Sequence, residues 1–266
     1  MLHSVLLKTL RDTRRALAWW SLGLCGLVSI MVAVYPSIRD NASLESLIKD
    51  YPEALKAFIA FGGTVDYGSA AGYLGSELFS FMVPLLFLVA AIGAGARAIA
   101  GEEERGTLDL LLANPLSRNR LVLEKLAALV VELAFLGAVL WLSLAIGTAL
   151  TAMEIGLTNL AAATFAAALL ALLFGVLAVL VGSATGRRGL ALAVPAAAAV
   201  AAYLVNALAA IVGALEPVRP LSPFYHYAAG DPLRHGLTLD HTMALVIVTA
   251  VLAAIALPVF SRRDLT

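Results

Sequence analysis

Long runs of apolar residues separated by short polar segments dominate the chain. Six of these runs reach the ~20 residues that an α-helix needs to cross the hydrocarbon core of a bilayer. The predicted spans cover residues 16–35, 77–100, 121–152, 159–184, 190–215 and 242–260. Within these runs Leu78–Ala96 has no charged residue, and Leu126–Ala152 has one, Glu132. The pattern predicts an all-α integral membrane protein with a single transmembrane domain over residues 1–266.

The first fifteen residues have an amphipathic pattern. One helical face is apolar and carries Leu2, Val5, Leu6 and Leu10. The basic residues lie elsewhere on the helix: Lys8, Arg11, Arg14 and Arg15. This favours a separate helix over 1–15 that lies in the membrane interface. A cleaved signal peptide is the alternative, but the apolar run is too long and no small-x-small cleavage site ends it.

Composition agrees with a membrane protein. Hydrophobic residues make up 61% of the chain and charged residues 14%, whereas charged residues are about 25% of an ordinary soluble domain. The formal net charge is zero, so we expect no nucleic-acid partner. Cys25 is the single cysteine, which excludes an intrachain disulfide.

The distribution of basic residues predicts the orientation. Six spans place both termini on one side of the membrane, and positive residues are enriched on the cytoplasmic side. Thirteen lie on the side of the termini: Lys8, Arg11, Arg14, Arg15, Arg97, Arg105, Arg118, Arg120, Lys125, Arg187, Arg188, Arg262 and Arg263. Five lie on the other side: Arg39, Lys49, Lys56, Arg219 and Arg234. Both termini are therefore predicted to be cytoplasmic.

A polar segment between the second and third spans, Gly101–Arg120, is here called the connector. Thr107 can cap a short helix within it, and the residue before Pro115 avoids the helical region and ends that helix. Its leucines at helical spacing, Leu108, Leu111 and Leu112, share one face. From the residues alone, a docking element and a solvated loop whose leucines rest on lipid fit equally well.

The order Glu103-x-x-Gly106-Thr-Leu-x-Leu-Leu-Leu-x-x-Pro115-Leu-Ser-Arg118, followed by Lys125, resembles the loop between the second and third spans of ABC type-2 permeases. In that family this loop carries the coupling helix that contacts the ATP-binding subunit. The resemblance implies ATPase-contacting residues at Glu102, Glu103, Glu104, Arg105, Gly106, Thr107, Leu108, Leu111, Leu112 and Pro115. The three glutamates also fit a solvated charge run. Arg187 and Arg188 fit either a topology signal or a second contact.

A second resemblance lies between the fifth and sixth spans. Ser222-Pro-Phe-Tyr-His-Tyr227 and Gly230-Asp-Pro-Leu-Arg-His-Gly236 resemble the family's segment that dips back into the outer leaflet as short helices. The resemblance implies outer re-entrant helices containing Pro223, Phe224 and Tyr225.

The resemblance implies the membrane-spanning subunit of an ATP-driven ABC exporter in the plasma (inner) membrane. Its implied partners are two copies of a cytoplasmic ATP-binding subunit, a second permease subunit of the same or a related chain, and membrane lipid. ATP and Mg would be bound by the partner, because no lysine here follows a glycine as a phosphate-binding loop requires. No catalytic site or cofactor is expected in this chain. The scarcity of charge in the spans favours an amphiphilic substrate such as a drug, lipid or peptide.

Three polar side chains in the spans are candidates for a translocation path: Glu132, Tyr203 and Asn206. Glu132 fits two other interpretations equally, a structural pair with Arg97 or a neutral, hydrogen-bonded acid, because a buried carboxylate is costly in lipid. An ion-coupled secondary transporter would need such intramembrane groups, and Glu132 is nearly the only one.

A membrane enzyme or scaffold would need a polar cluster at one face of the membrane. The outer segment with His226, His235, His241, Asp231 and Asp240 is the one candidate. Its spacing matches no metal signature, so no metal site is predicted.

Overall fold

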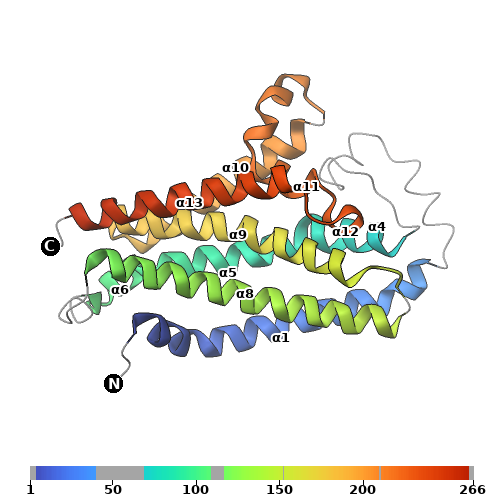
Figure 1. The fold of residues 1–266 in the computed structure, drawn as a ribbon, viewed down its shortest axis with the longest axis horizontal. Coiled ribbons are helices and arrows are strands. Elements are labelled where there is room, and N and C mark those ends of the chain that lie inside the picture. The colour runs from blue at the N-terminus through green and yellow to red at the C-terminus, as the bar shows by residue number, and fades with distance from the viewer. Residues whose placement is uncertain (1–3, 40–68, 109–116, 152, 210, 264–266) are drawn as a thin grey trace.

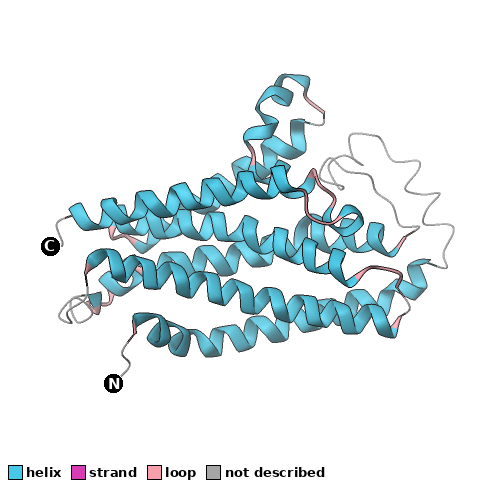
Figure 2. Ribbon diagram, in the orientation of Figure 1, coloured by secondary structure: helices cyan, strands magenta, loops and turns pink. Residues whose placement is uncertain are grey.

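The computed structural model describes residues 4–39, 69–108, 117–151, 153–209 and 211–263. Six helical segments in this part of the chain are long and apolar enough to cross a membrane. They are α1 (Val5–Arg39), Ala70–Ala98, α8 (Arg118–Leu150), α9 (Leu157–Thr185), α10 (Arg188–Ala209) and α13 (Leu239–Arg262). The described residues contain no strand (Figure 2). The prediction of an all-helical chain with six span candidates is confirmed.

The first helix differs from its prediction. α1 runs without a break from Val5 to Arg39, so a separate interfacial helix over 1–15, followed by a span over 16–35, does not describe it. The sequence from Val5 to Ser21 contains neither glycine nor proline. Nothing therefore interrupts the backbone hydrogen bonds where the pattern changes from amphipathic to apolar.

The second span contains a change of helical geometry. α4 (Ala70–Leu74) is capped by Ser69, whose side chain accepts a hydrogen bond from the Gly72 amide. It continues as a wider π-helix, η1 (Gly75–Met82), and then as α5 (Val83–Ala98). Pro84, in the first turn of α5, has no N–H to donate to the preceding turn. The wider turn lies directly before this proline, which is where such a mismatch is absorbed.

The helices form an elongated bundle with α9 at its centre (Figure 1). α9 packs against α5, α8, α10 and α13. Its closest neighbour is α5: a Cβ added at Gly95 would collide with the Gly175 carbonyl, and one added at Gly175 would lie 3.1 Å from the Ala91 Cβ. Small residues thus allow the two backbones to approach closely, as in other membrane helix pairs.

The two ends of the bundle differ in what they carry. The described parts of the connector, residues 101–108 and 117–120, lie at one end of the bundle, which we call the connector end (Figure 1). The short helix α6 (Ala100–Glu104), the start of α1 and the end of α13 lie at the same end. The opposite, far end carries α4 and two short helices, α11 (Pro223–Ala228) and α12 (Pro232–His235).

The fifth span ends earlier than predicted. α10 stops at Ala209 rather than at residue 215, and the 3₁₀ helix η2 (Gly213–Leu221) follows. The apolar residues Ile211 and Val212 prolong the hydrophobic run, but both donate their amides to the Leu208 carbonyl in a closing turn. Pro217 and Pro220 then lie within the 3₁₀ helix, which buries none of its residues. η2 therefore contributes little to the core of the bundle.

Candidate functional site

The beginning of the connector folds back on itself. Arg105 and Gly106 form a turn after α6, with Gly106 in the left-handed region at φ 66°. The Thr107 amide donates to the Glu102 carbonyl, and the Thr107 hydroxyl donates to both the carbonyl and the carboxylate of Glu102. Leu108 is 3% exposed and belongs to the core of the bundle. Among the residues predicted to contact an ATPase, Leu111, Leu112 and Pro115 lie outside the described residues.

Glu102 is the centre of a buried ionic cluster. Its carboxylate is 2.8 Å from the Lys125 ammonium of α8, and Lys125 is 3% exposed. Lys8 of α1 and Arg105 lie 3.9 and 3.7 Å away. Burial raises the pKa of the Glu102 carboxyl, but the hydrogen bonds from Lys125 and Thr107, together with the positive charges of Lys125 and Lys8, hold the pKa below its ordinary value. Glu102 is therefore an ionised group that joins α6 to α8 and α1.

Glu103 and Glu104 also have partners within the chain. The Glu103 carboxylate pairs with Arg263, the residue after α13. The Glu104 carboxylate accepts a hydrogen bond of 2.9 Å from the Arg188 amide at the start of α10. The sequence suggested either a solvated charge run or contacts with another subunit for these glutamates. It contained no signal for these partners, which are distant in sequence.

Glu132 lies in a polar cavity near the connector end. The cavity has a volume of about 130 Å³ and is lined by α1, α5, α6 and α8. The Thr13 hydroxyl donates a 2.8 Å hydrogen bond to the Glu132 carboxylate. Arg97 lines the same cavity, but these two described residues form no ion pair in the structure. Of the interpretations left open by the sequence, the direct pair with Arg97 is not formed, and the hydrogen-bond donor is Thr13, which sequence reasoning missed.

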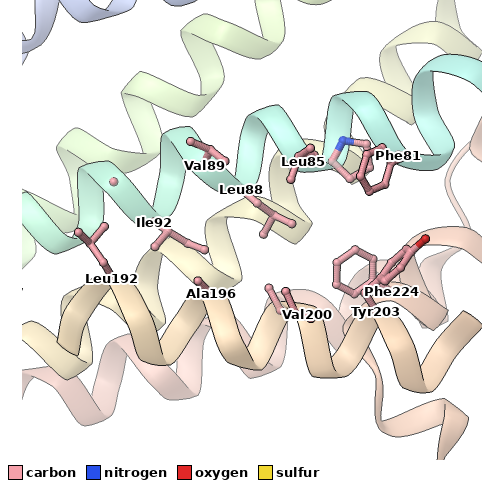
Figure 3. Close-up of a pocket in the computed structure, with 13 residues that line it drawn as sticks. Phe81, Leu85, Leu88, Val89, Ile92, Leu192, Ala196, Val200, Tyr203 and Phe224 are labelled. Carbon is pink, nitrogen blue, oxygen red and sulfur yellow. The ribbon is translucent and has the colours of Figure 1, made fainter. Parts of the chain in front are cut away.

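Tyr203 lines a second, apolar cavity on the opposite side of α5. This cavity has a volume of about 330 Å³ and lies between α5 and α10. Figure 3 shows Phe81, Leu88, Ile92, Tyr203 and Phe224 around it. No charged residue is among its lining residues. The Tyr203 and Phe224 rings meet edge to face, with centroids 5.7 Å apart, and close the far end of the cavity.

The candidate path residues are therefore not brought together. Glu132 and Tyr203 line different cavities. Asn206 is completely buried and lines neither of them. The oxygen of its side-chain amide accepts a 3.2 Å hydrogen bond from Arg219, and this contact joins the end of α10 to η2. The geometry of Asn206 is that of a side chain that orders this junction.

The predicted re-entrant residues lie in α11, which packs onto the bundle. The Ser222 hydroxyl caps this helix by accepting a hydrogen bond from the Phe224 amide, and Pro223 occupies the first turn. Phe224 is buried against Phe174 of α9, whereas Tyr225 is partly exposed. The structure shows a short helix here, and its depth in the membrane stays a prediction.

Two further side chains, to which the sequence assigned no role, hold this segment in place. The Tyr227 hydroxyl donates a 2.6 Å hydrogen bond to the Phe79 carbonyl, and burial raises the pKa of that hydroxyl. Asn159 of α9 donates to the carbonyls of Leu233 and Arg234. The segment is therefore anchored by polar contacts to the second and fourth spans.

The histidines of the far end come together only in part. The Nδ1 atoms of His226 and His241 are 3.1 Å apart, and the His226 Nε2 lies 2.9 Å from the Pro220 carbonyl. His235, at the end of α12, is not part of this pair. The described residues contain no group of three or more side chains suited to hold a metal ion.

The comparison with protein families covers almost the whole chain. A family model described as ABC-2 family transporter protein matches residues 3–265. A search of the curated proteins found no match. Permeases of this family are membrane transport components that generally work with an ATP-binding subunit. With its six apolar helices and a match over nearly its full length, the chain belongs to the ABC-2 family of transporter proteins and is a multi-pass membrane protein.

Proposed function

We propose that this chain is the membrane-spanning permease of an ATP-driven exporter, energised by a separate cytoplasmic ATP-binding subunit. The observation that carries the proposal is the family match over residues 3–265. The fold supports it, because the described parts of the connector lie at the same end of the bundle as the start of α1 and the end of α13 (Figure 1). The thirteen basic residues assigned to that side make it the cytoplasmic side by the positive-inside rule. The connector is thus available to a cytoplasmic partner.

The proposed assembly contains two copies of the ATP-binding subunit, which hold ATP and Mg, and a second permease, the same chain or a related one, in the plasma membrane. Closure of the ATP-binding subunits would displace the connector and shift the spans between two arrangements. A nucleotide can do this only if it favours one arrangement over the other.

The apolar cavity between α5 and α10 is the proposed substrate site. Its volume of about 330 Å³ is within the usual range for small-molecule sites. Apolar walls with an aromatic cap of Phe81, Tyr203 and Phe224 favour an amphiphilic substrate such as a drug, lipid or peptide. The outer helices α11 and α12 would then lie above this cavity as the proposed re-entrant segment.

An ion-coupled transporter is the second candidate, and it rests on Glu132 and its polar cavity. The two proposals differ in their energy source. Proteoliposomes containing the permease and its ATP-binding partner should accumulate a lipophilic fluorescent dye only with hydrolysable ATP. Accumulation driven by an ion gradient without ATP would favour the second candidate.

Docking is tested by replacing Leu111 and Leu112 together with Asp. Burying a leucine side chain contributes roughly 1.5–3 kcal/mol, and ~1.4 kcal/mol is a tenfold change in affinity. The double variant should therefore lose the co-purifying ATP-binding subunit while its amount in the membrane is unchanged. Asn119→Asp, an added charge at an exposed position of the same connector, is the control and should retain the subunit. Retention by the double variant would exclude these leucines as docking anchors.

A further inference from the structure

Three consecutive glutamates of α6 reach three different parts of the bundle. Successive residues of an α-helix are about 100° apart around its axis, because one turn contains 3.6 residues. Glu102, Glu103 and Glu104 therefore point in three directions from one short helix. Glu102 reaches Lys125 of α8, Glu103 reaches Arg263 beyond α13, and Glu104 reaches the Arg188 amide of α10.

The contact of Glu103 extends to two more helices. Its partner Arg263 also donates to the Ser183 carbonyl near the end of α9. The carbonyl of Arg263 accepts a hydrogen bond from Arg118 at the start of α8. Gly186, the left-handed residue that ends α9, leaves room for this arrangement, since a Cβ there would collide with Arg263 and lie 2.6 Å from the Glu103 carboxylate.

The contact of Glu104 has a different chemistry. Arg188 begins α10, and the first amides of a helix have no partner within that helix. The carboxylate of Glu104 accepts a hydrogen bond from one of these amides, that of Arg188. The negative charge of the carboxylate suits the positive end of the helix. Glu104 therefore acts as a cap that is supplied by another helix, and the contact needs an acceptor atom more than it needs a charge.

Together these contacts connect α6 with every candidate span. α5 directly precedes α6 in the chain. Glu102 connects α6 to α8 through Lys125 and to α1 through Lys8. Glu103 contacts Arg263, which directly follows α13, and Arg263 in turn contacts α9. Glu104 adds α10. The apolar cavity proposed as the substrate site does not include these three side chains, and they are distinct from the leucines proposed for docking.

We propose that Glu102, Glu103 and Glu104 are positioning residues that make α6 the joint through which a displacement of the connector moves the other five spans. The inference rests on the proposed function for the source of that displacement. It assigns the glutamates to contacts within the permease, and docking of the ATP-binding subunit to the rest of the connector. Each contact moves a particular helix, so each loss has a local effect.

The joint is tested first in the full-length permease alone, reconstituted in lipid nanodiscs. In a Cys25→Ser background, spin labels at Arg105 and Ser261 report the distance between the connector and α13. Labels at Arg105 and Gly189 report the distance between the connector and α10. All three labelled positions are exposed. We expect narrow distance distributions for both pairs without further substitution.

Glu103→Ala should broaden the distribution of the Arg105–Ser261 pair and leave the Arg105–Gly189 pair narrow. Glu104→Ala should do the opposite. Glu104→Gln keeps an acceptor for the Arg188 amide, so the distance distribution of the Arg105–Gly189 pair should remain narrow in this variant. The exchange of Glu103→Lys with Arg263→Glu restores opposite charges and should narrow the first pair again. Alanine is a good helix former, so α6 itself should persist. Unchanged distributions in both alanine variants would overturn the proposal.

The second measurement uses the complex with the ATP-binding subunit. ATP with vanadate should shift the Arg105–Ser261 distance in the protein that carries all three glutamates. Glu103→Ala should lose this shift while co-purifying the same amount of ATP-binding subunit. Loss of that subunit from Glu103→Ala or Glu104→Ala, with narrow distances, would make the glutamates docking contacts and would refute the joint. If even the unsubstituted permease retains no ATP-binding subunit, the proposed function fails, and the measurements on the permease alone still decide the joint.

Discussion

The two sides of α5 face cavities of opposite chemistry. Toward α10 the cavity is apolar and has a volume of about 330 Å³. Toward α1 and α8 the cavity is polar, has a volume of about 130 Å³, and contains Arg97, Lys125 and Glu132. Charged groups of both signs line this cavity, and Lys125 and Glu102 are paired directly. Charge buried in a membrane protein often marks a transport path, but here Lys125 is paired with Glu102 of α6 and Glu132 accepts a hydrogen bond from Thr13 of α1.

The comparison teaches that partners, rather than charge itself, indicate the role of a buried polar group. Glu132 accepts a hydrogen bond from Thr13 of α1, and the surrounding cavity contains both signs of charge. A side chain satisfied in this way stabilises the contact between α1 and α8. The lining of the apolar cavity contains no charged side chain that needs a partner, which agrees with the substrate site proposed there.

The largest loss of stability should come from breaking the pair on the polar side. Lys125→Met leaves the Glu102 carboxylate buried without its main partner. Removing one member of a buried ion pair costs about 3–5 kcal/mol. The variant should show a strong fall in the thermal unfolding temperature in detergent.

The double variant Glu102→Gln with Lys125→Met is the matched control. It removes both charges, and it should recover most of the lost stability, since replacing a whole buried pair is often neutral. Equal unfolding temperatures for Lys125→Met and the unsubstituted protein would show that the pair is not buried as described.

A smaller loss is expected where α5 meets α9, a contact that fixes the position of both cavities. A Cβ at Gly175 would lie 3.0 Å from a Leu129 methyl and 3.1 Å from the Ala91 Cβ. Gly175→Leu should therefore overpack this contact at a cost of roughly 1–3 kcal/mol, measured as a lower unfolding temperature. Gly26→Ala, where an added Cβ meets nothing within 4 Å, should change the unfolding temperature little. A tolerated leucine at position 175 would contradict the close packing of α5 on α9.

The smallest effect should be the pH dependence that Glu102 confers. The pKa of Glu102 is lowered in the folded protein from the ordinary value of 4.5, so the unfolded state binds more protons at low pH. The stability from this group is present above pH 4.5 and is lost as the pH falls through the lowered pKa. Glu102 should therefore contribute no pH dependence to the unfolding temperature near neutral pH, and the unfolding temperature should fall in acid. The unfolding temperature of the variant Glu102→Gln with Lys125→Met should fall less steeply with decreasing pH. Equal slopes in the variant and the unsubstituted protein would contradict the assignment of this pH dependence to Glu102.

The sequence predicted the elements of this fold well because they depend on local pattern. Long apolar runs are sufficient to locate six helices, and most of their ends agree with the structure within a few residues. The early end of α10 was missed because Ile211 and Val212 are as apolar as the span before them. The helix over 1–15 was predicted as separate because amphipathic patterning describes a surface, not a break in the backbone.

The site was less predictable because its contacts join residues far apart in the chain. Glu103 and Arg263 are separated by 160 positions, and Glu104 and Arg188 by 84. A helical pattern shows which residues share a face but not which distant helix will meet that face. The sequence left Glu132 open between a path residue, a pair with Arg97 and a neutral, hydrogen-bonded acid, and the structure shows a hydrogen bond from Thr13 to its carboxylate.

The contrast between the two sides of α5 is tested most directly by comparing transport in two variants. Ala196→Phe fills the apolar cavity from α10, and Glu132→Gln removes the charge of the polar cavity while keeping an acceptor for Thr13. Both are reconstituted with the ATP-binding subunit, and ATP-dependent uptake of a lipophilic fluorescent dye is measured at equal protein content. The account predicts that Ala196→Phe loses most dye uptake and that Glu132→Gln retains it. Full uptake with Ala196→Phe together with lost uptake in a stably folded Glu132→Gln would contradict the account and place the path on the polar side.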